Sequence, residues 1–416
     1  MESTLATYPQ DPYAPLKIPE FRYFIAGRFI YIMGIRMTVT VLGWWIYTLT
    51  NSKLALGFVG LSEVIPALSF ALYAGHYIDK TEKRKLLLKC VAGYAFCIAL
   101  LAVLSWQQTE NALTPWTIAV LVFGVIGITG FVRAFSGPTF SAMISQIVPR
   151  EMLPNAAAIS SGGWLTASIV GHAAGGFSIA FLGIHSTFIL VVMLVIAAWI
   201  LFRKLKPKPA MLKNPKNPWQ SVKEGIKHVY QTKELMGALV LDLFAVLFGG
   251  AVALVPVFAQ DILKIGPIGF GWLNAAADIG AIMTVTYLTI RPLKRNQGRI
   301  LFYAIAGFGG CIILFALSEI FWLSFAALLL SGCMDGFSVI IRGTILQLKT
   351  PDELRGRVAA VNSMFINSSN ELGQFESGVA AKLMGTVPAV VFGGCMTLAV
   401  VVATWFKAPA LRKMQY

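Results

Sequence analysis

Apolar stretches long enough to cross a lipid bilayer recur along the whole chain of 416 residues. A helix rises about 1.5 Å per residue, so roughly 20 consecutive apolar residues span the hydrocarbon core of a membrane. About twelve such stretches occur, at residues 22–49, 54–78, 86–106, 115–145, 155–182, 186–203, 235–259, 268–290, 299–317, 321–347, 357–384 and 387–406. The sequence therefore predicts an all-α membrane protein with about twelve transmembrane helices.

Composition argues against a soluble protein of this size. The chain is 57% hydrophobic and only 13% charged, which leaves too little polar surface to coat a soluble globule. The first 20 residues are polar, contain proline and lack the apolar core of a cleavable signal peptide. We therefore expect the first long apolar helix to direct insertion.

Lysine and arginine are concentrated in every second connection, and such residues are retained on the cytoplasmic side during insertion. The basic connections are 80–85, 150, 203–227, 291–299 and 349–357, whereas the opposite connections offer only Lys53 and Lys264. We therefore expect both termini in the cytoplasm, with the protein in the plasma or inner membrane. The net charge of +15 is mostly this excess, which predicts contact with anionic lipid headgroups rather than with nucleic acid.

Internal duplication is visible at one offset. Residues 149–161 align without gaps on 351–363, and the same shift places 130–136 on 332–338 and 171–172 on 373–374. Agreement of three segments at one offset predicts two pseudo-symmetric six-helix bundles. The expected organisation is a tail at 1–20, a bundle at 21–203, a linker at 204–233, a second bundle at 234–407 and a tail at 408–416.

The linker begins as a basic, proline-rich segment that is typical of an extended spacer. Apolar residues then recur at helical spacing opposite Lys223 and Lys227. These are Trp219, Val222, Ile226 and Val229. The pattern predicts an amphipathic helix on the cytoplasmic face of the membrane.

The connection after the second apolar stretch, residues 75–85, reads Gly-His-Tyr-Ile-Asp-Lys-Thr-Glu-Lys-Arg-Lys. It resembles the Gly-x-x-x-Asp-(Arg/Lys)-x-x-(Arg/Lys)-(Arg/Lys) signature of the major facilitator superfamily. The resemblance implies a cytoplasmic latch against the C-terminal half, formed by Gly75, Asp79, Lys83 and Arg84. A plain cluster of positive-inside charges explains the same basic residues.

Residues 47–57, 239–248, 255–259 and 350–362 are similar to the enterobactin-exporter and macrolide-efflux branch of that superfamily. This similarity implies the major facilitator fold and proton-coupled export. One departure lies in the fifth stretch, where antiporters often carry Gly-Pro-x-x-Gly-Gly and this chain has His172 in place of the proline. Gly171, Gly175 and Gly176 still permit close helix packing. The missing proline removes a kink and part of the support for antiport.

Ionisable residues inside the predicted spans are few, and a charge in hydrocarbon is costly unless it is paired or faces water. They are Arg28, Arg36, Glu63, Arg133, Asp242, Asp278, Asp335, Arg342, Glu371 and Glu376. The superfamily fold implies that the first, fourth, seventh and tenth spans line a central cavity, which would contain Arg28, Arg36, Arg133, Asp242, Asp335 and Arg342.

The duplication places Arg133 opposite Asp335, and a comparable alignment places Arg28 opposite Asp242. We hypothesise that these opposite charges pair across the cavity; the alternative is that each pairs within its own half.

The eleventh stretch is unusually polar. Asn367, Asn370, Glu371 and Gln374 share one helical face, which could bind a polar substrate or bond to neighbouring helices. A carboxylate couples transport to protons only if its proton affinity changes between access states. Asp335 and Glu371 are our candidates, and His172 is either a packing residue or a coupling residue.

The leading functional hypothesis is a proton-coupled exporter of a small amphipathic molecule such as a siderophore or a drug, acting as a monomer. Alternatives are an uptake transporter, a ferroportin-like transporter of divalent metal, and a membrane enzyme or scramblase. Possible metal ligands are Asp242, Asp335, Cys333 and His172, without a recognisable site spacing. Because neither a phosphate-binding loop nor a hydrolase motif occurs, we expect no enzymatic activity, no cofactor and no bound metal.

Overall fold

The computed structural model describes residues 11–207, 218–293, 295–351 and 354–415, and every regular element in these ranges is helical. Ten helical segments in these ranges are long and apolar enough to cross a membrane. The long helices are α1 (Pro19–Thr50), α2 (Lys53–Lys80), α3 (Lys83–Leu104), α5 (Pro115–Ile147), α6 (Leu153–Arg203), α8 (Lys233–Phe248), α10 (Pro267–Ile290), α11 (Gln297–Ala316), α12 (Phe321–Lys349), α13 (Arg355–Met384) and α14 (Thr386–Lys407). Short helices are α4 (Gln107–Ala112), α7 (Pro218–Gln231), α9 (Val255–Val257) and α15 (Pro409–Arg412).

Helix α6 contains two of the predicted stretches, because the chain reverses at Gly183. That glycine has a φ of 78°, in the left-handed region that glycine tolerates best. The first arm is parallel to α1, as shown by Gly171 lying against Met33 and Gly175 against Thr40. The second arm runs back along α1, with the contacts Val195–Gly34 and Phe202–Gly27. The predicted stretches 155–182 and 186–203 are therefore two antiparallel arms.

The predicted stretch 235–259 is not one continuous helix. Helix α8 ends at Phe248, and short helical turns η3 (Ala251–Leu254), α9 and η4 (Phe258–Ile262) follow. Gly250 occupies the break, and a methyl group there would lie 2.7 Å from the carbonyl oxygen of Gly373 on α13. The glycine therefore allows the two backbones to approach closely.

The duplication read from the sequence extends to backbone geometry. Helices α5 and α12 end at Ile147 and Lys349, and the reversal at Gly183 is matched by Gly385, each pair being 202 residues apart. Gly385 also has a positive φ, of 94°, and joins α13 to α14. The two arms of α6 are therefore the counterparts of α13 and α14.

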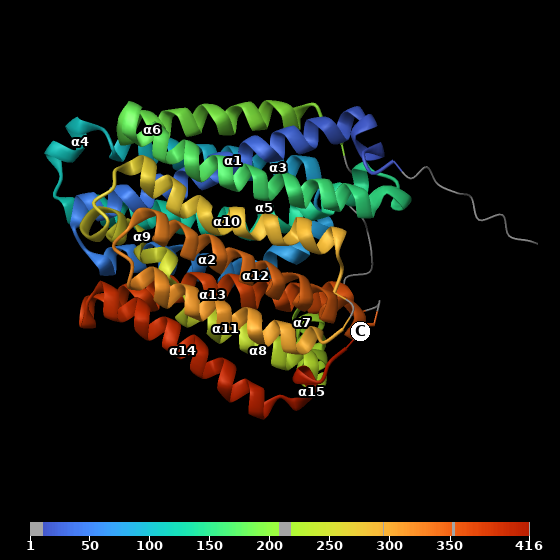
Figure 1. Cartoon of the computed structure of the whole chain (residues 1–416). Helices are drawn as coiled ribbons and strands as arrows, with labels where there is room; N and C mark the ends of the chain where they lie inside the picture. Colours follow the sequence, from blue (N-terminus) through green and yellow to red (C-terminus); the bar gives the residue numbers. More distant parts are fainter. Residues whose placement is uncertain (1–10, 208–217, 294, 352–353, 416) are drawn as a thin grey trace, which may run out of the picture.

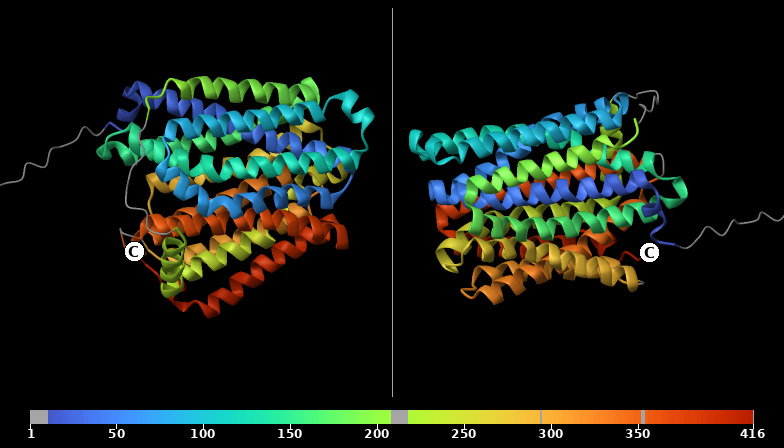
Figure 2. Two further views of the ribbon diagram at one scale, coloured as in Figure 1. Left: turned by 180° about the vertical axis from the view of Figure 1, so that it is seen from behind. Right: turned by 90° about the horizontal axis from the view of Figure 1, so that it is seen from above.

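The long helices pack as two groups. The N-terminal group contains α1, α2, α3, α5 and α6, and the C-terminal group contains α8 and α10 to α14. Packing of α2 against α13 and of α6 against α10 joins them. Figures 1 and 2 show the helices side by side along one common direction, with α4 at one end of the bundle and α7 and α15 at the other. We call these the α4 end and the α7 end.

Contacts between the groups are tight toward the α4 end. On α2, a methyl group at Gly57 would lie 3.2 Å from the backbone of Phe375 in α13. On α6, a methyl group at Gly176 would lie 2.5 Å from the carbonyl oxygen of Pro267 in α10. Side chains of α1 also cross over, since Tyr47 donates a hydrogen bond to Asp261.

The same helices are loosely surrounded toward the α7 end. Among the described residues, no heavy atom apart from the neighbouring backbone of the same helix lies within 4 Å of a methyl group placed at Gly75 of α2, Gly163 of α6 or Gly356 of α13. On α10, Tyr287 is 52% exposed and Ile290 is 74% exposed. The groups therefore pack closely at the α4 end and offer open space at the α7 end.

Basic residues follow the same polarity. Because successive spans alternate in direction, the basic connections 80–85, 150, 203–207 and 291–299 fall at the α7 end. Lys53 and Lys264 fall at the α4 end. Lys382, in the last turn of α13, is a further basic residue at this end. The apolar stretch 357–384 had included it within a span. The α7 end still has more basic residues than the α4 end.

The described face of the linker helix, α7, packs against other helices of the protein. Helix α7 contacts α13, α8 and α2, with Val229 buried and Glu224 paired with Arg357. Ile226 is 40% exposed. The structure has a helix at the predicted place, and its position on the cytoplasmic membrane face stays a prediction. The side chains of Trp219 and Val222 in its apolar stripe lie outside the described part.

Candidate functional site

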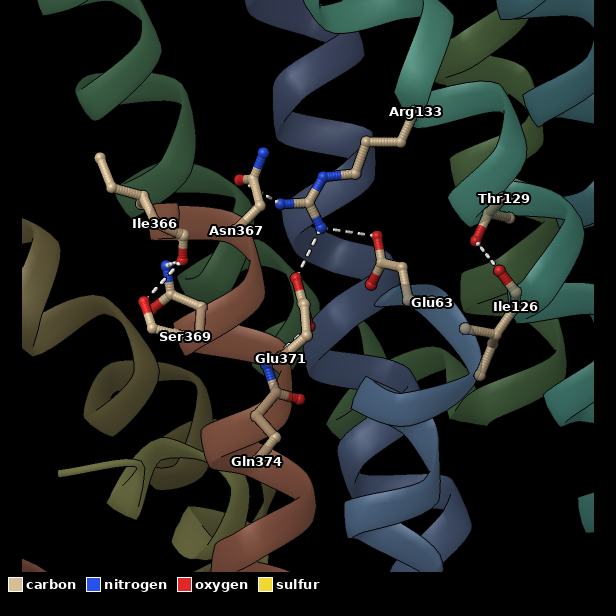
Figure 3. A network of polar contacts seen from close by, with 10 residues as sticks. Glu63, Ile126, Thr129, Arg133, Ile366, Asn367, Ser369, Glu371 and Gln374 are labelled. Carbon is tan, nitrogen blue, oxygen red and sulfur yellow. Dashed lines mark hydrogen bonds and ion pairs between the residues drawn. The ribbon is translucent and has the colours of Figure 1, made fainter. Parts of the chain in front are cut away.

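Arg133 on α5 is the centre of a polar network that joins the two groups of helices (Figure 3). Its Nη1 donates to Oε1 of Glu63 on α2 and to Oε1 of Glu371 on α13, at 2.7 Å in each case. Its Nη2 lies 3.4 Å from Oδ1 of Asn367, and Gln374 donates to the other oxygen of Glu371 at 3.1 Å. One guanidinium thus holds a carboxylate from each group.

Burial differs sharply within this network. The side chain of Glu371 is 8% exposed, that of Glu63 is 23% exposed and that of Arg133 is 44% exposed. Arg133 therefore borders open space while its carboxylate partners lie deeper. Close backbone approach makes this possible, because Gly60 lets α2 approach the backbone at Glu371, and Gly130 lets α5 approach the backbone at Glu63.

A second polar junction joins the groups between α6 and α10. Ser168 of α6 donates to Oδ2 of Asp278 on α10 at 2.5 Å, and Nε2 of His172 lies 3.8 Å from the same oxygen. The other ring nitrogen of His172 is 2.8 Å from the hydroxyl of Thr40 on α1. His172 therefore belongs to a contact between the groups rather than to simple packing within one of them.

The two junctions occupy equivalent places in the duplication. Gly130 of α5 packs on Glu63 of α2, and its counterpart Gly332 of α12 packs on Ala277 beside Asp278 in α10. His172 is likewise the counterpart of Gln374. Glu63 and Asp278 were in the inventory of membrane charges but not among the predicted site residues. The alignment of Arg28 on Asp242, a shift of 214 residues, places Glu63 on Ala277, next to Asp278, and was the signal that could have located this position.

A third cluster lies inside the C-terminal group. Arg342 of α12 forms an ion pair with Asp242 of α8, and its Nε donates to Ser338 at 3.2 Å. The Arg342 and Asp242 side chains are 6% and 7% exposed. Asp335 lines a small hollow together with Asp242 and Ser338. These residues supply two carboxylates for one arginine.

The pairings hypothesised from pseudo-symmetry are wrong for this structure. Arg133 bridges to Glu371 instead of Asp335, because Asp335 lies beside Asp242 within the C-terminal group. Arg28 donates to the hydroxyl of Ser160 instead of pairing with Asp242. The offset identified equivalent positions correctly, but equivalent positions need not be neighbours in a given access state.

The remaining predicted site residues lie in three settings. The Arg36 guanidinium lies over the Trp164 ring at 4.9 Å from its centroid. Asn370 donates to the carbonyl of Ile366 in its own helix, so it is not part of the polar network. The glycines Gly171, Gly175 and Gly176 form the close helix contacts that were predicted, the first two against α1 and the third against α10.

The signature between α2 and α3 makes its described contacts within the N-terminal group. Lys83 donates to the carbonyl of Ile78, and Arg84 donates to the carbonyl of Arg203 at 2.7 Å. A methyl group added at Gly75 would have no neighbour within 4 Å, and the side chain of Asp79 lies outside the described part. A latch to the C-terminal group remains a prediction.

The described ranges contain no cluster of possible metal ligands. There, His, Cys, Asp and Glu nowhere form a group of three or more that could hold an ion. Cys333 and Asp335 lie on α12, whereas His172 contacts Thr40 and Asp278.

Comparison with known proteins finds a matching family model and similar transport proteins. A family model described as "Transmembrane secretion effector" matches residues 10–415. The enterobactin exporter EntS of Shigella flexneri is 26% identical over 82% of this chain and 80% of its own length. The staphyloferrin A transporter of Staphylococcus aureus (strain NCTC 8325 / PS 47) is 20% identical over 92% of this chain and 95% of its own length.

Among solved structures, a mutant of the nucleoside transporter NupG superposes with a TM-score of 0.72 at 14% identity, covering 93% of this chain and 99% of that one. This likeness shows the fold of a transporter. The relatives, the match along nearly the whole length and the apolar helices agree on a multi-pass membrane protein. The chain belongs to the transmembrane secretion effector family of major facilitator superfamily transporters.

Proposed function

We propose that this transporter is a proton-coupled exporter that moves a small amphipathic molecule, such as a siderophore or a drug, by alternating access. It works as a monomer in the plasma or inner membrane, with twelve spans in two six-helix halves. The twelve are the ten apolar segments, with α6 counted as two arms, and the more polar α13.

Orientation follows from the basic α7 end. Positive residues stay in the cytoplasm during insertion, so the α7 end is cytoplasmic, as are both termini. The groups of helices touch at the α4 end and offer open space at the α7 end. The described arrangement is then an inward-open state, in which a cytoplasmic substrate can enter between the groups.

The observation that carries the proposal is Arg133 holding carboxylates from both groups, Glu63 and Glu371. An alternating-access cycle needs contacts between the halves that form in one state and break in the other. Proton uptake by Glu371 removes its charge and weakens its bond to Arg133. Protonation can therefore bias the two access states, which is what coupling requires.

Two relatives support a siderophore-type substrate, since their names specify enterobactin export and staphyloferrin A transport. Uptake is the alternative direction, and divalent metal is the alternative cargo. Reconstitution into liposomes with an imposed pH gradient separates these possibilities. We expect accumulation of siderophores or amphipathic drugs on the side that loses protons. Accumulation on the side that gains protons, or movement that a metal gradient drives and a pH gradient does not, would overturn the proposal.

Replacing Asp335 with asparagine is expected to weaken proton dependence while leaving substrate exchange intact. Asp335 faces a hollow beside Asp242 and Arg342, and it is the carboxylate in that trio without a hydrogen bond among the described residues. A matched control is Glu319→Gln, on an exposed residue at the α4 end. We expect drug accumulation driven by pH to fall roughly tenfold, equivalent to about 1.4 kcal/mol. Full proton-driven transport by Asp335→Asn would remove Asp335 from the coupling mechanism.

A further inference from the structure

Among the described residues, Arg28 on α1 has no carboxylate partner within 4 Å, and neither has Arg36, whose guanidinium lies over the Trp164 ring. Arg133 and Arg342 both form ion pairs, but no carboxylate of the described residues lies within 4 Å of the Arg28 guanidinium. Its Nη1 donates to the neutral hydroxyl of Ser160, and the group lies 5.6 Å from the centroid of the Phe140 ring. Its Nε is buried and has no acceptor among the described residues.

A small hollow lies next to this unpaired charge. It is lined by α1 and by the first arm of α6, and its lining residues are Ile25, Arg28, Phe29, Ser160, Gly163 and Trp164. The hollow has free space at Gly163, since a methyl group added there would have no described neighbour within 4 Å. The hollow thus combines a cation, a hydroxyl donor, an aromatic ring and apolar walls.

The hollow has room for about one water-sized group, so it suits the oxygen end of an anionic group whose remaining part lies outside the hollow. A partly buried cation without a counter-charge is costly, and a carboxylate or phenolate oxygen offsets that cost with charge-assisted hydrogen bonds. The Trp164 ring and the apolar walls favour an attached aromatic or apolar body. A neutral ligand of equal size would leave the charge of Arg28 unbalanced.

We propose that the hollow at Arg28 is a subsite for an anionic oxygen group, supplied by the transported molecule or by an anionic lipid headgroup. The inference rests on the proposed function and specifies the charge of its substrate. Arg28 binds the anion, Ser160 orients the guanidinium and Trp164 packs against the ring of the ligand. The subsite lies in the part of the protein nearer the open α7 end, where ligands from the cytoplasm arrive first.

Binding can be measured without transport. The purified full chain is placed in nanodiscs of phosphatidylcholine, and benzoate is titrated by saturation-transfer NMR, with neutral benzamide as the matched probe. We expect benzoate to bind the unmodified protein at least tenfold more tightly than Arg28→Gln, and benzamide to bind both alike. Arg28→Lys is expected to retain part of the affinity because it keeps the charge.

Controls make the result decisive. Arg22→Gln removes an exposed arginine from the same helix and should leave benzoate binding unchanged. Thermal unfolding confirms that each variant folds. Equal benzoate affinity in the unmodified protein and Arg28→Gln, or no benzoate binding to either, would overturn the subsite.

Repeating the titration with phosphatidylglycerol in the nanodiscs identifies the source of the anion. Weaker benzoate binding in the unmodified protein, with no such change in Arg28→Gln, identifies a lipid headgroup as an occupant of the site. Unchanged affinity excludes the lipid headgroup and leaves the transported molecule as the source of the anion. Because no proton gradient is applied, failure of this test leaves proton-driven export standing, and failure of the transport assay leaves the binding result standing.

Discussion

Arg133→Gln is expected to abolish most proton-driven transport. The variant removes the cation shared by Glu63 and Glu371, so α2 and α5 lose their ionic tie to α13. Glu371, whose side chain is 8% exposed, is then left without its cationic partner. Coupling contacts of this kind change the balance of two states by about 1–3 kcal/mol, or roughly 5- to 150-fold. Drug accumulation in proteoliposomes with an imposed pH gradient measures the loss.

Two further variants separate coupling from folding. Arg133→Lys keeps a positive charge but cannot hold both carboxylates in the same fork, so partial activity is expected. Arg150→Gln removes an exposed arginine in the turn that follows α5 and should transport normally. Normal proton-driven accumulation by Arg133→Gln, at unchanged protein levels, would contradict the role assigned to this network.

Gly176→Val is expected to shift the transporter away from the described state. Its added Cβ would lie 2.5 Å from the carbonyl oxygen of Pro267 and 2.9 Å from Cα of Gly271, both of them backbone atoms of α10. Because these are backbone atoms, relief requires a shift of the helices, and we expect α6 to separate from α10 and open the α4 end. Overpacking typically costs about 1–3 kcal/mol, so roughly a 5- to 150-fold shift in populations follows.

Cysteine labelling reports this shift. Phe58 of α2 packs against Phe375 of α13 at 5.6 Å between ring centroids, so a cysteine at residue 58 is shielded while the groups touch. We expect a membrane-impermeant thiol reagent to label Phe58→Cys faster when Gly176→Val is also present. Gly124→Val is the matched control, because nothing lies within 4 Å of a methyl group there. Identical labelling rates with all three backgrounds would contradict the predicted shift.

Hydropathy and duplication predicted the helices well because both can be read from the sequence without any knowledge of tertiary contacts. The apolar stretches located the helices, and the 202-residue offset extended to the paired reversals at Gly183 and Gly385. The break in the seventh stretch was missed, since glycine and proline within an apolar run do not by themselves specify where a helix stops. Close approach of Gly250 to α13 is a tertiary contact that hydropathy does not contain.

The candidate site was predicted only in part. Membrane charges are rare enough that the inventory contained every charged member of the networks around Arg133 and Arg342, yet their partners were misassigned. Arg133 meets Glu371 because α2 packs against both α5 and α13, so the long Arg133 side chain can reach across to α13, and this depends on the access state. Asp278 was passed over because it looks like any other membrane carboxylate until Ser168 and His172 are seen beside it.

Alternating access is tested most directly by bridging the two groups of helices where they touch. Gln260 donates to Thr48 at 3.1 Å across the α4 end, so cysteines at these positions can be joined by a short, reducible bifunctional thiol reagent in a Cys395→Ser background. The measured quantity is drug accumulation in proteoliposomes driven by a pH gradient. We predict that bridging stops transport, that a reductant restores it, and that the single variant Thr48→Cys is unaffected by the reagent. Transport at full rate through the bridged protein would contradict alternating access between these two groups.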